Sequence, residues 1–271
     1  MTPRLTITSI HNRHVTEACK LAQRKYRQSE GRFLVEGLQI LYMALDASLQ
    51  PIDVFFCETL LKGIGGSGLL ERFSHTDATL IAVSEPVMRR LSERSTPQGI
   101  AATFPLLDTS FRTHALTGHE LVLVLDRLHD PGNVGTLLRT ADAAGVAAVI
   151  MIEPCVDVFD PKVVRASMGS LFTVHLMCTE DVPRLFEWLA DRGLRRVGAD
   201  VSQGLWEMDT GGVALVLGSE AQGLSEDVRA YIEDWVRLPI IGRAESLNVA
   251  VAGGVLMYTW LRANYVSGGD P

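Results

Sequence analysis

The sequence predicts an α/β protein made of two successive domains, and three features lead to this prediction. Helical and strand-like patterns alternate along almost all of its 271 residues, as they do in α/β folds. In the second half, uninterrupted apolar runs such as residues 121–125 (LVLVL) indicate strands that are buried on both faces of a parallel sheet. Between the halves, residues 106–119 are rich in Thr and Ser and break the pattern, which indicates a linker.

The first predicted domain covers residues 1–105 and is a small α/β unit. Its elements follow from short apolar runs separated by turn residues. They are expected, in order, as a basic amphipathic helix at 9–29, a strand at 33–37, a helix at 37–47, strands at 54–57 and 80–83, a helix at 86–92 capped by Ser84, and a strand at 99–104. The glycine-rich stretch 63–68 is expected to be a flexible loop, because it lacks the Lys–Ser/Thr pair of a phosphate-binding loop.

The second predicted domain covers residues 120–266 and is dominated by a parallel sheet. Its strands are expected at 121–125, 147–152, 196–199, 213–217 and 235–238, with a further short strand at 172–176. Helical segments separate the strands, and a long helix at 246–263 ends the domain. Small residues at 250 and 252–254 would let this last helix approach another backbone closely.

Charge is distributed unevenly along the chain. The protein carries a formal charge of −7, yet residues 1–32 hold seven basic residues and two acidic ones. A basic segment on an acidic body fits either a phosphate-binding surface or a solvated helix face. The four cysteines form no CxxC pair, so reduced thiols and no metal site are expected. No apolar run approaches the ~20 residues of a membrane span and the N-terminus shows no secretory signal, so we expect no membrane association and a cytoplasmic protein.

The first strand of the second domain leads into a polar turn with candidate functional residues. The turn reads DPGN from residue 130, with Asp126 before it and Arg139 in the helix that follows. Asn133 is expected to cap that helix. An Arg among apolar helical neighbours beside a Gly-containing turn is suited to binding a phosphate, although an ordinary salt-bridged Arg would give the same pattern.

A second polar turn follows the strand expected at 213–217. It reads GSEAQG from residue 218. Its glycines let a ligand approach the backbone closely, and Glu220 is placed to accept hydrogen bonds from amino or hydroxyl groups. A helix cap at Ser225 would explain the end of this stretch but not Gly218 or Glu220.

A third turn precedes the terminal helix and reads LPIIGRAESLNV from residue 238. Ser246 is expected to cap that helix and Asn248 to lie in its first turn, where Asn is a mediocre helix former and needs another role. Leu238 and Leu247 flank the turn and could clamp a flat ring. Because α/β proteins form ligand sites where strands give way to helices, the three turns together predict one composite pocket.

The order and spacing of these residues resemble the three motifs of the SpoU (TrmH) family of RNA 2′-O-ribose methyltransferases, within the SPOUT superfamily. The matching positions are Asn133, Gly135 and Arg139, then Gly218, Glu220 and Gly223, then Pro239, Ser246, Leu247 and Asn248. The first domain is similar to the small RNA-binding α/β domain that precedes many SpoU domains, through residues 24–27, 33–37 and 96–100. Ala221 stands where Gly is commoner in the family.

The resemblance implies a fold, a cofactor and an activity. The fold is a parallel SPOUT sheet whose C-terminal chain forms a deep trefoil knot, assembled as a homodimer. The cofactor is S-adenosylmethionine, and the implied reaction is 2′-O-ribose methylation of RNA, with ribosomal RNA favoured by the added first domain. Transfer RNA as substrate, an antibiotic-resistance role and a non-catalytic RNA-binding or ribosome-assembly role stay open. A nicotinamide-dependent dehydrogenase is disfavoured, because the first turn lacks G-x-G-x-x-G.

The resemblance also implies residue roles, position by position. The implied catalytic residues are Arg139, Asn133, Glu220, Ser246 and Asn248. Arg139 would be the base or an electrostatic activator of the 2′-hydroxyl, although a guanidinium pKa above about 12 makes an Arg base unusual. The implied cofactor-binding residues are Leu217, Gly218, Glu220, Gly223, Leu238, Ile240 and Leu247. The residues expected to bind RNA are Arg24, Lys25 and Arg27.

Overall fold

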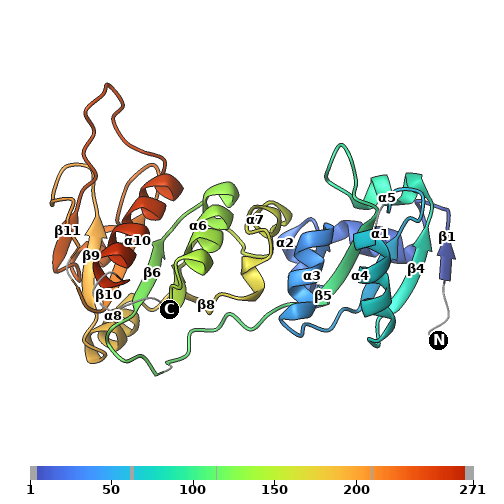
Figure 1. The fold of residues 1–271 in the computed structure, drawn as a ribbon, viewed down its shortest axis with the longest axis horizontal. Coiled ribbons are helices and arrows are strands. Elements are labelled where there is room, and N and C mark those ends of the chain that lie inside the picture. The colour runs from blue at the N-terminus through green and yellow to red at the C-terminus, as the bar shows by residue number, and fades with distance from the viewer. Residues whose placement is uncertain (1–4, 62–63, 114, 209, 266–271) are drawn as a thin grey trace. The chain divides into compact units, whose positions relative to one another are not determined.

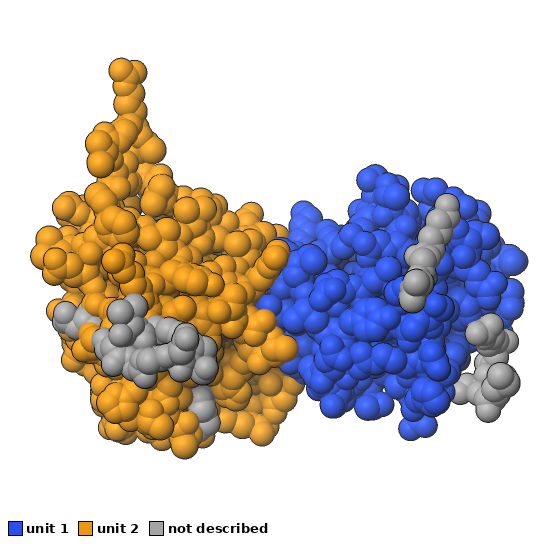
Figure 2. Space-filling model, viewed as in Figure 1, with its two compact units in different colours: residues 1–107, 157–172 blue, residues 108–156, 173–271 orange. Residues whose placement is uncertain are grey.

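The computed structural model confirms an α/β protein and describes residues 5–61, 64–113, 115–208 and 210–265. The chain divides into two compact units (Figure 2). Unit 1 comprises Met1–Leu107 and Asp157–Phe172, and unit 2 comprises Asp108–Val156 and Thr173–Pro271. The short segment 157–172 therefore comes from the second half of the sequence but packs with the first.

Unit 1 is built on a five-stranded sheet in the order β1-β4-β3-β5-β2. Its strands are β1 (Leu5–Ile7), β2 (Arg32–Glu36), β3 (Asp53–Phe56), β4 (Thr79–Val83) and β5 (Ile100–Pro105). β5 pairs antiparallel with β2 and β3, and the other pairs are parallel. Its helices are α1 (Arg13–Lys20), α2 (Arg24–Glu30), α3 (Leu38–Asp46), α4 (Ile64–Ser74), α5 (Glu85–Leu91), α7 (Pro161–Ala166) and the 3-10 turn η1 (Ser170–Phe172).

Residues 64–68 of the glycine-rich stretch are helical, which corrects the expectation of a flexible loop there, and Gly63 lies outside the described residues. Residues 64–68 form the start of α4. A Cβ on Gly66 would lie 2.5 Å from Cγ of Leu61, and a Cβ on Gly68 would lie 3.1 Å from the hydroxyl of Tyr42. Glycine therefore serves close packing here rather than flexibility. The helix expected at 9–29 is likewise divided into α1 and α2, and β1 precedes them.

Segment 157–172 is held in unit 1 by a buried ion pair and by ring contacts. Arg27 is 2% exposed, and its Nε and Nη2 donate to Oδ2 of Asp157 at 3.0 and 2.6 Å. Phe33 on β2 lies 4.9 Å from Phe159 and 6.4 Å from Phe172, measured between ring centroids. Because Arg27, Phe33 and Phe159 are all buried, the segment forms part of the core of unit 1.

Unit 2 contains a six-stranded parallel sheet in the order β11-β9-β10-β6-β7-β8. The strands are β6 (Leu121–Asp126), β7 (Ala148–Ile152), β8 (Leu176–Thr179), β9 (Arg195–Ala199), β10 (Val213–Gly218) and β11 (Asp234–Val236). Every residue of β6 and β7 is buried, as predicted from their continuous apolar runs. The short strand expected at 172–176 instead begins at Leu176, because the chain up to Phe172 turns as η1.

Helices cover both faces of this sheet (Figure 1). They are α6 (Pro131–Ala143), α8 (Val182–Asp191), α9 (Glu226–Arg229) and α10 (Val249–Tyr265). Side chains of α8 and α9 share an apolar cluster with Val122 and Val124 of β6. On the other face α10 packs against α6 and β10, where a Cβ on Gly253 would lie 2.6 Å from side-chain atoms of Leu137 and Leu217. Gly253 thus serves close packing of α10 within unit 2.

The outward side of α10 is apolar and exposed. Val251, Val255 and Tyr258 recur at helical spacing and are 55%, 38% and 48% exposed. The chain between β11 and α10 projects away from unit 2 (Figure 1), and Ile241 within it is 97% exposed. An apolar patch of this kind is suited to contact with another molecule. Among the described residues, no helix has the length and apolar character needed to cross a membrane.

Candidate active site

Three side chains, one from each predicted motif, form a single hydrogen-bonded chain. Asn133 lies in the first turn of α6, Glu220 in the loop after β10, and Asn248 directly before α10. Nδ2 of Asn248 donates to Oδ1 of Asn133 at 2.8 Å, and Nδ2 of Asn133 donates to Oε1 of Glu220 at 2.8 Å. The parallel sheet therefore brings these distant residues to one point at its carboxyl edge.

The helix caps beside this chain differ from the expected ones. Asp130, not Asn133, is the N-cap of α6, and its Oδ1 accepts from the N–H of Asn133 at 2.7 Å. Oδ1 of Asn248 accepts from two backbone N–H groups in the first turn of α10 at 2.9 and 3.2 Å, so Asn248 takes the capping role expected of Ser246. Asn248 uses its oxygen for the cap and its amino group for Asn133, which explains an Asn at this position.

Arg139 is an exposed cation on α6. It lies six residues after Asn133, about 9 Å farther along the helix axis, and its neighbours Leu137 and Leu138 are buried. Among the residues that the structure describes, Arg139 has no hydrogen-bond or ion-pair partner, and no bond connects it to Asn133. A guanidinium without an internal partner is suited to an anion from another molecule, such as a phosphate.

A pocket of about 270 Å³ opens beside Glu220. One wall comes from the end of β6 and the turn after it, and the other comes from the loop after β10. The lining residues are Asp126, Arg127, His129, Ser219, Glu220, Ala221, Gln222, Gly223 and Ser225. Because Glu220 lines the pocket and also holds Asn133, the pocket and the hydrogen-bonded chain form one continuous site.

The loop after β10 is closed on itself. Ser219 and Gly223 exchange two backbone hydrogen bonds of 3.0 and 2.9 Å. A Cβ at Gly218 would collide with the backbone of Gly223 and Leu224, and Gly223 itself has φ +69°. Both glycines are therefore required by the loop itself, and the loop in turn presents Glu220 at its tip.

The residues expected to bind a cofactor are spread over several strand ends. Leu217 is buried in β10, and Gly218 and Gly223 belong to the closed loop. Leu238 and Ile240 are half-buried after β11, and Leu247 is 42% exposed. In the described part of the chain no backbone hydrogen bond joins residues 238–247 to the closed loop.

Asp126 and Arg127 line the pocket, although no role was predicted for either of them. Asp126 is 1% exposed, and its Oδ2 accepts from the N–H and the hydroxyl of Ser225 at 2.7 and 2.8 Å. Arg127 has φ +55° and donates from Nη2 to Asp227 at 2.7 Å. The available signal was an Asp ending the apolar run LVLVLD, since a carboxylate at a fully buried strand end needs partners.

Carboxylates near these strand ends are held in their ionised form. The Ser225 hydroxyl, with the Arg127 guanidinium nearby, keeps the pKa of Asp227 below its usual range, although burial opposes this. At the end of β9, burial alone would raise the pKa of Asp200, but hydrogen bonds from Ser202, Gln203 and Arg229 lower it to about 2. The site edge therefore carries fixed negative charges at neutral pH.

The residues of unit 1 expected to bind RNA do not all lie on its surface. Arg24 and Lys25 are exposed on α2, and Nζ of Lys25 lies 4.7 Å from the ring centroid of Tyr26. Arg27 is buried on the same helix and is bound to Asp157, which corrects the expectation that it contacts RNA. Its Nη1 also donates to two backbone carbonyls at 2.8 and 2.9 Å, so its guanidinium is fully engaged within unit 1.

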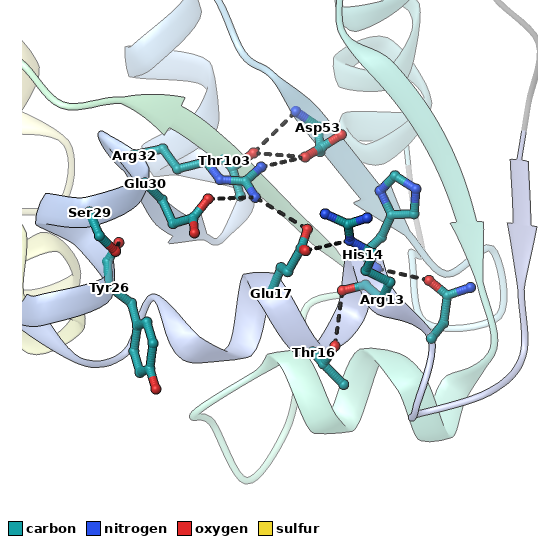
Figure 3. Close-up of polar contacts among 11 residues, drawn as sticks. Arg13, His14, Thr16, Glu17, Tyr26, Ser29, Glu30, Arg32, Asp53 and Thr103 are labelled. Carbon is teal, nitrogen blue, oxygen red and sulfur yellow. Dashed lines mark hydrogen bonds and ion pairs between the residues drawn. The ribbon is translucent and has the colours of Figure 1, made fainter.

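Arg32 is a second internal cation of the basic segment, as Figure 3 shows. Its guanidinium lies 3.0 Å from a carboxylate oxygen of Asp53, and 3.7 and 3.8 Å from those of Glu17 and Glu30. Arg13 also donates to Glu17, at 2.6 Å. Because several of its cations are paired with carboxylates, the described part of segment 1–32 presents less positive charge at the surface than its sequence indicates.

Comparison with protein families finds two matches along the chain. The model of the SpoU rRNA Methylase family matches residues 120–258, and the model of the MRM3-like substrate binding domain matches residues 12–102. The second match lies within unit 1. The first covers the three motifs and also includes segment 157–172, which packs with unit 1.

Individual relatives match the chain along nearly its whole length. A tRNA/rRNA methyltransferase of Synechocystis sp., described as uncharacterized, is 35% identical over 97% of this chain and 95% of its own. The 23S rRNA (guanosine(2553)-2′-O)-methyltransferase RlmP of Bacillus subtilis is 30% identical over 93% of this chain and 97% of its own. The crystal structure of an AdoMet-bound rRNA methyltransferase from Sinorhizobium meliloti is similar with a TM-score of 0.84 and 29% identity, over 96% of this chain and 98% of that chain.

Proposed function

Because the chain belongs to the SpoU rRNA methylase family, it is an S-adenosylmethionine-dependent RNA methyltransferase, and we propose that it methylates a ribose 2′-hydroxyl of ribosomal RNA. The observation that carries the site assignment is the hydrogen-bonded chain Asn248–Asn133–Glu220. It joins the three motifs at one point, beside a pocket and on the same helix as a cation without an internal partner.

The proposed catalytic residues share the task of preparing a ribose hydroxyl. When bound, S-adenosylmethionine supplies a methyl group on a positively charged sulfur. Arg139 stabilises the negative charge that develops on the 2′-oxygen as the hydroxyl proton passes to solvent water, and also holds the adjacent phosphate. The amide of Asn133, fixed by Glu220 and Asn248, orients the ribose, so that positioning supplies much of the rate enhancement. The exposed Ser246 hydroxyl orients the nucleotide from the third motif.

The proposed cofactor-binding residues suit the cofactor's chemistry. The closed loop containing Gly218, Glu220 and Gly223 offers backbone groups for its polar part. The partly exposed apolar side chains of the third motif, together with Leu217 at the strand end, offer a surface for its adenine ring. These apolar residues of the third motif are Leu238, Ile240 and Leu247.

Unit 1 is proposed to bind the RNA substrate. Arg24 and Lys25 are its candidate phosphate contacts, and the match to a substrate-binding domain supports the assignment. RlmP, similar over nearly the whole chain, is named for 23S rRNA, which favours ribosomal over transfer RNA. An rRNA substrate would place the protein in the cytoplasm with the ribosome.

A homodimer through unit 2 and a knotted C-terminal chain are also proposed. The exposed residues Val251, Val255 and Tyr258 support a partner that covers α10. The knot is inferred from family membership. A sedimentation mass near 29.6 kDa, that of one chain, at micromolar concentration would contradict the dimer.

The activity is tested by supplying the purified protein with S-adenosylmethionine labelled in its methyl group. Ribosomal RNA and transfer RNA, each from a strain that lacks the gene, are the two substrates. We expect label in ribosomal RNA at one ribose 2′-oxygen, located by resistance of the neighbouring bond to alkali. Label in transfer RNA alone would overturn the substrate, and cofactor binding without transfer to any RNA would favour the non-catalytic alternative.

A further inference from the structure

A second pocket, of about 250 Å³, opens within unit 1. Its walls come from α1, β2, α5 and α7, together with the turn that follows α5. All of the residues that line it belong to unit 1, whereas Asn133, Glu220 and Asn248 belong to unit 2. The pocket therefore shares no residue with the proposed site of methyl transfer, and the proposed function gives it no role.

Glu36 places a buried carboxylate in this pocket, and only one of its oxygens is satisfied within the protein. Glu36 is the last residue of β2 and is 7% exposed. Its Oε1 accepts a hydrogen bond of 2.6 Å from the hydroxyl of Ser92. Its Oε2 has no hydrogen-bond or ion-pair partner among the described residues, and it is not sealed from solvent. A buried carboxylate is seldom left without partners, so Oε2 is suited to accept a hydrogen bond from a ligand in the pocket.

Two guanidinium groups line the same pocket and differ in their partners. Nη1 of Arg165 on α7 donates to Oε2 of Glu93 at 2.7 Å, so these two charges offset each other. Arg90 near the end of α5 is exposed, and in the described part of the chain its guanidinium has neither a hydrogen bond nor an ion pair. Of the two cations, Arg90 is therefore the one that is available to a phosphate.

Apolar side chains line the pocket between these polar groups. Leu34 is half-buried on β2, and Leu91 and Val164 are 4% and 1% exposed. A base of RNA has two apolar faces and a polar edge, and proteins recognise it mainly where it is unstacked. The pocket offers apolar walls for such faces and the carboxylate of Glu36 for such an edge.

We propose that this pocket binds one unstacked base of the RNA substrate, with Glu36 accepting from an amino group of the base and Arg90 contacting its phosphate. Adenine, cytosine and guanine carry such an amino group, whereas the single N–H at the edge of uracil lies between two carbonyl oxygens that a carboxylate repels. A volume of about 250 Å³ lies just below the about 300–1,000 Å³ of whole-ligand pockets, which suits a base better than a whole nucleotide. The inference rests on the proposed function, because it requires RNA as the substrate.

The first test removes single amino groups from the RNA. The probe is a short RNA that spans the mapped methylation site, in which one unpaired nucleotide other than the target is changed at a time. Purine riboside replaces adenosine, inosine replaces guanosine and pyrimidin-2-one riboside replaces cytidine, so that only the amino group is lost. One of these replacements should weaken binding to the full-length wild-type protein about tenfold, because it removes one hydrogen bond to a charged group.

Glu36→Gln tests the protein side of the same bond. Gln keeps an oxygen for the hydroxyl of Ser92 and places an NH₂ group at the position of Oε2. It should weaken binding of the unmodified RNA about tenfold, and the replacement that weakens wild-type binding should cause no further loss. S-adenosylmethionine affinity and the unfolding midpoint should not change. Glu71→Gln on α4 is the matched control, because it makes the same change of charge in unit 1 outside the pocket and should bind every RNA as the wild type does.

Arg90→Ala tests the phosphate contact, and it also tests the proposal if Glu36→Gln does not fold. The slope of log affinity against log salt should flatten by about 0.7, the contribution of one phosphate of a single strand. Arg89→Ala is the matched control. The guanidinium of Arg89 donates to Glu85 at 2.7 Å and does not line the pocket, so its removal should leave the slope unchanged.

AMP distinguishes an RNA site from a site for a free nucleotide, because it offers an amino group and a phosphate without the rest of the RNA. We expect no competition with RNA at equal concentration, and competition would overturn the proposal. Equal binding of all the RNAs by the wild type, wild-type RNA affinity in Glu36→Gln or an unchanged salt slope in Arg90→Ala would also overturn it. In these cases the wild type still transfers methyl groups to RNA, whereas failure of the proposed function would appear as no transfer at all.

Discussion

Helix α2 of unit 1 and helix α6 of unit 2 each carry an Arg, but the guanidinium groups of these two residues have opposite environments. Arg27 on α2 is 2% exposed and bonds to Asp157 and to two backbone carbonyls. Arg139 on α6 is exposed, and no described residue pairs with it. The first is therefore a structural group that holds a distant segment, and the second is available to a substrate.

The difference shows that available partners, rather than the local pattern, decide what a basic residue does. A buried guanidinium is tolerated only with a carboxylate and carbonyls around it, because the desolvation penalty is otherwise too large. Asp157 supplies this carboxylate from 130 residues away in the sequence. No carboxylate among the described residues pairs with Arg139, so its charge is available to a phosphate or to the ribose oxygen.

The largest expected effect comes from removing the buried Arg. Arg27→Ala leaves Asp157 and two carbonyls without their donor, and should destabilise unit 1 by about 3–5 kcal/mol. Urea unfolding of the full chain measures this. Arg24→Ala on the same helix is the control, and as an exposed substitution it should stay within about 0.5 kcal/mol. Equal losses of unfolding free energy in Arg27→Ala and Arg24→Ala would show that Arg27 has no special structural role.

Next in size is the effect of removing the exposed Arg of α6. Arg139→Ala should lower kcat by about 10²–10³, the cost of losing one group that stabilises developing charge. Its S-adenosylmethionine affinity, measured by calorimetry, and its unfolding midpoint should stay near those of the wild type. Turnover above a tenth of the wild-type value would contradict the catalytic assignment.

A smaller effect is expected from the exposed cations of unit 1. Each phosphate contact contributes about 0.7–0.9 to the log–log slope of RNA affinity against salt. Arg24→Ala/Lys25→Ala should therefore flatten this slope by about 1.5 and weaken RNA binding at moderate salt, without changing cofactor affinity. Arg72→Ala, which removes a cation paired with Asp46 on another helix, is the control and should leave the slope unchanged. If the double variant has the same salt dependence as the wild type, Arg24 and Lys25 do not contact RNA, and another surface must bind it.

The smallest effect concerns a carboxylate in unit 2 that is satisfied by backbone rather than by an Arg. Burial alone would raise the pKa of Glu120, but the N–H groups and hydroxyl around residues 117–119 lower it to about 2. A pKa lowered by folding gives stability above the unfolded pKa of about 4.5, and this stability is lost as pH falls toward 2. Glu120→Gln should therefore be less stable than wild type at pH 6, and the gap should narrow by pH 3. A stability difference between wild type and Glu120→Gln that does not change with pH would contradict the lowered pKa of Glu120.

Much of unit 2 could be predicted because its strands are marked by short, continuous patterns in the sequence. Strands β6 and β7 are continuous apolar runs, and the three motifs follow strand ends that a parallel sheet must bring together. Because parallel strands end at the same edge of the sheet, the sequence predicts that Asn133, Glu220 and Asn248 lie close together. It does not predict which of them form hydrogen bonds with each other. Helix α4 was missed because glycines usually indicate a loop, whereas Gly66 and Gly68 are needed for close packing.

The features that escaped prediction depend on contacts between residues far apart in the sequence. The burial of Arg27 requires Asp157, and the role of Asp126 requires Ser225, 99 positions away. Neither partner is marked by a nearby pattern. The helix caps were misplaced for a related reason, since Asp130 and Asn133 are both good caps and the geometry of the turn decides between them.

The placement of residues 157–172 has a consequence for synthesis of the chain on the ribosome. Unit 1 lacks α7, η1 and the partner of Arg27 until residue 172 has emerged, which is 65 residues after Leu107. At about 5–20 residues per second, this delay lasts about 3–13 s. During that time the nascent first unit would expose the apolar surface around Phe33. Translation speed across residues 108–172 therefore sets how long a nearly complete domain waits in an aggregation-prone form, and a nascent-chain binding factor would protect it over this interval.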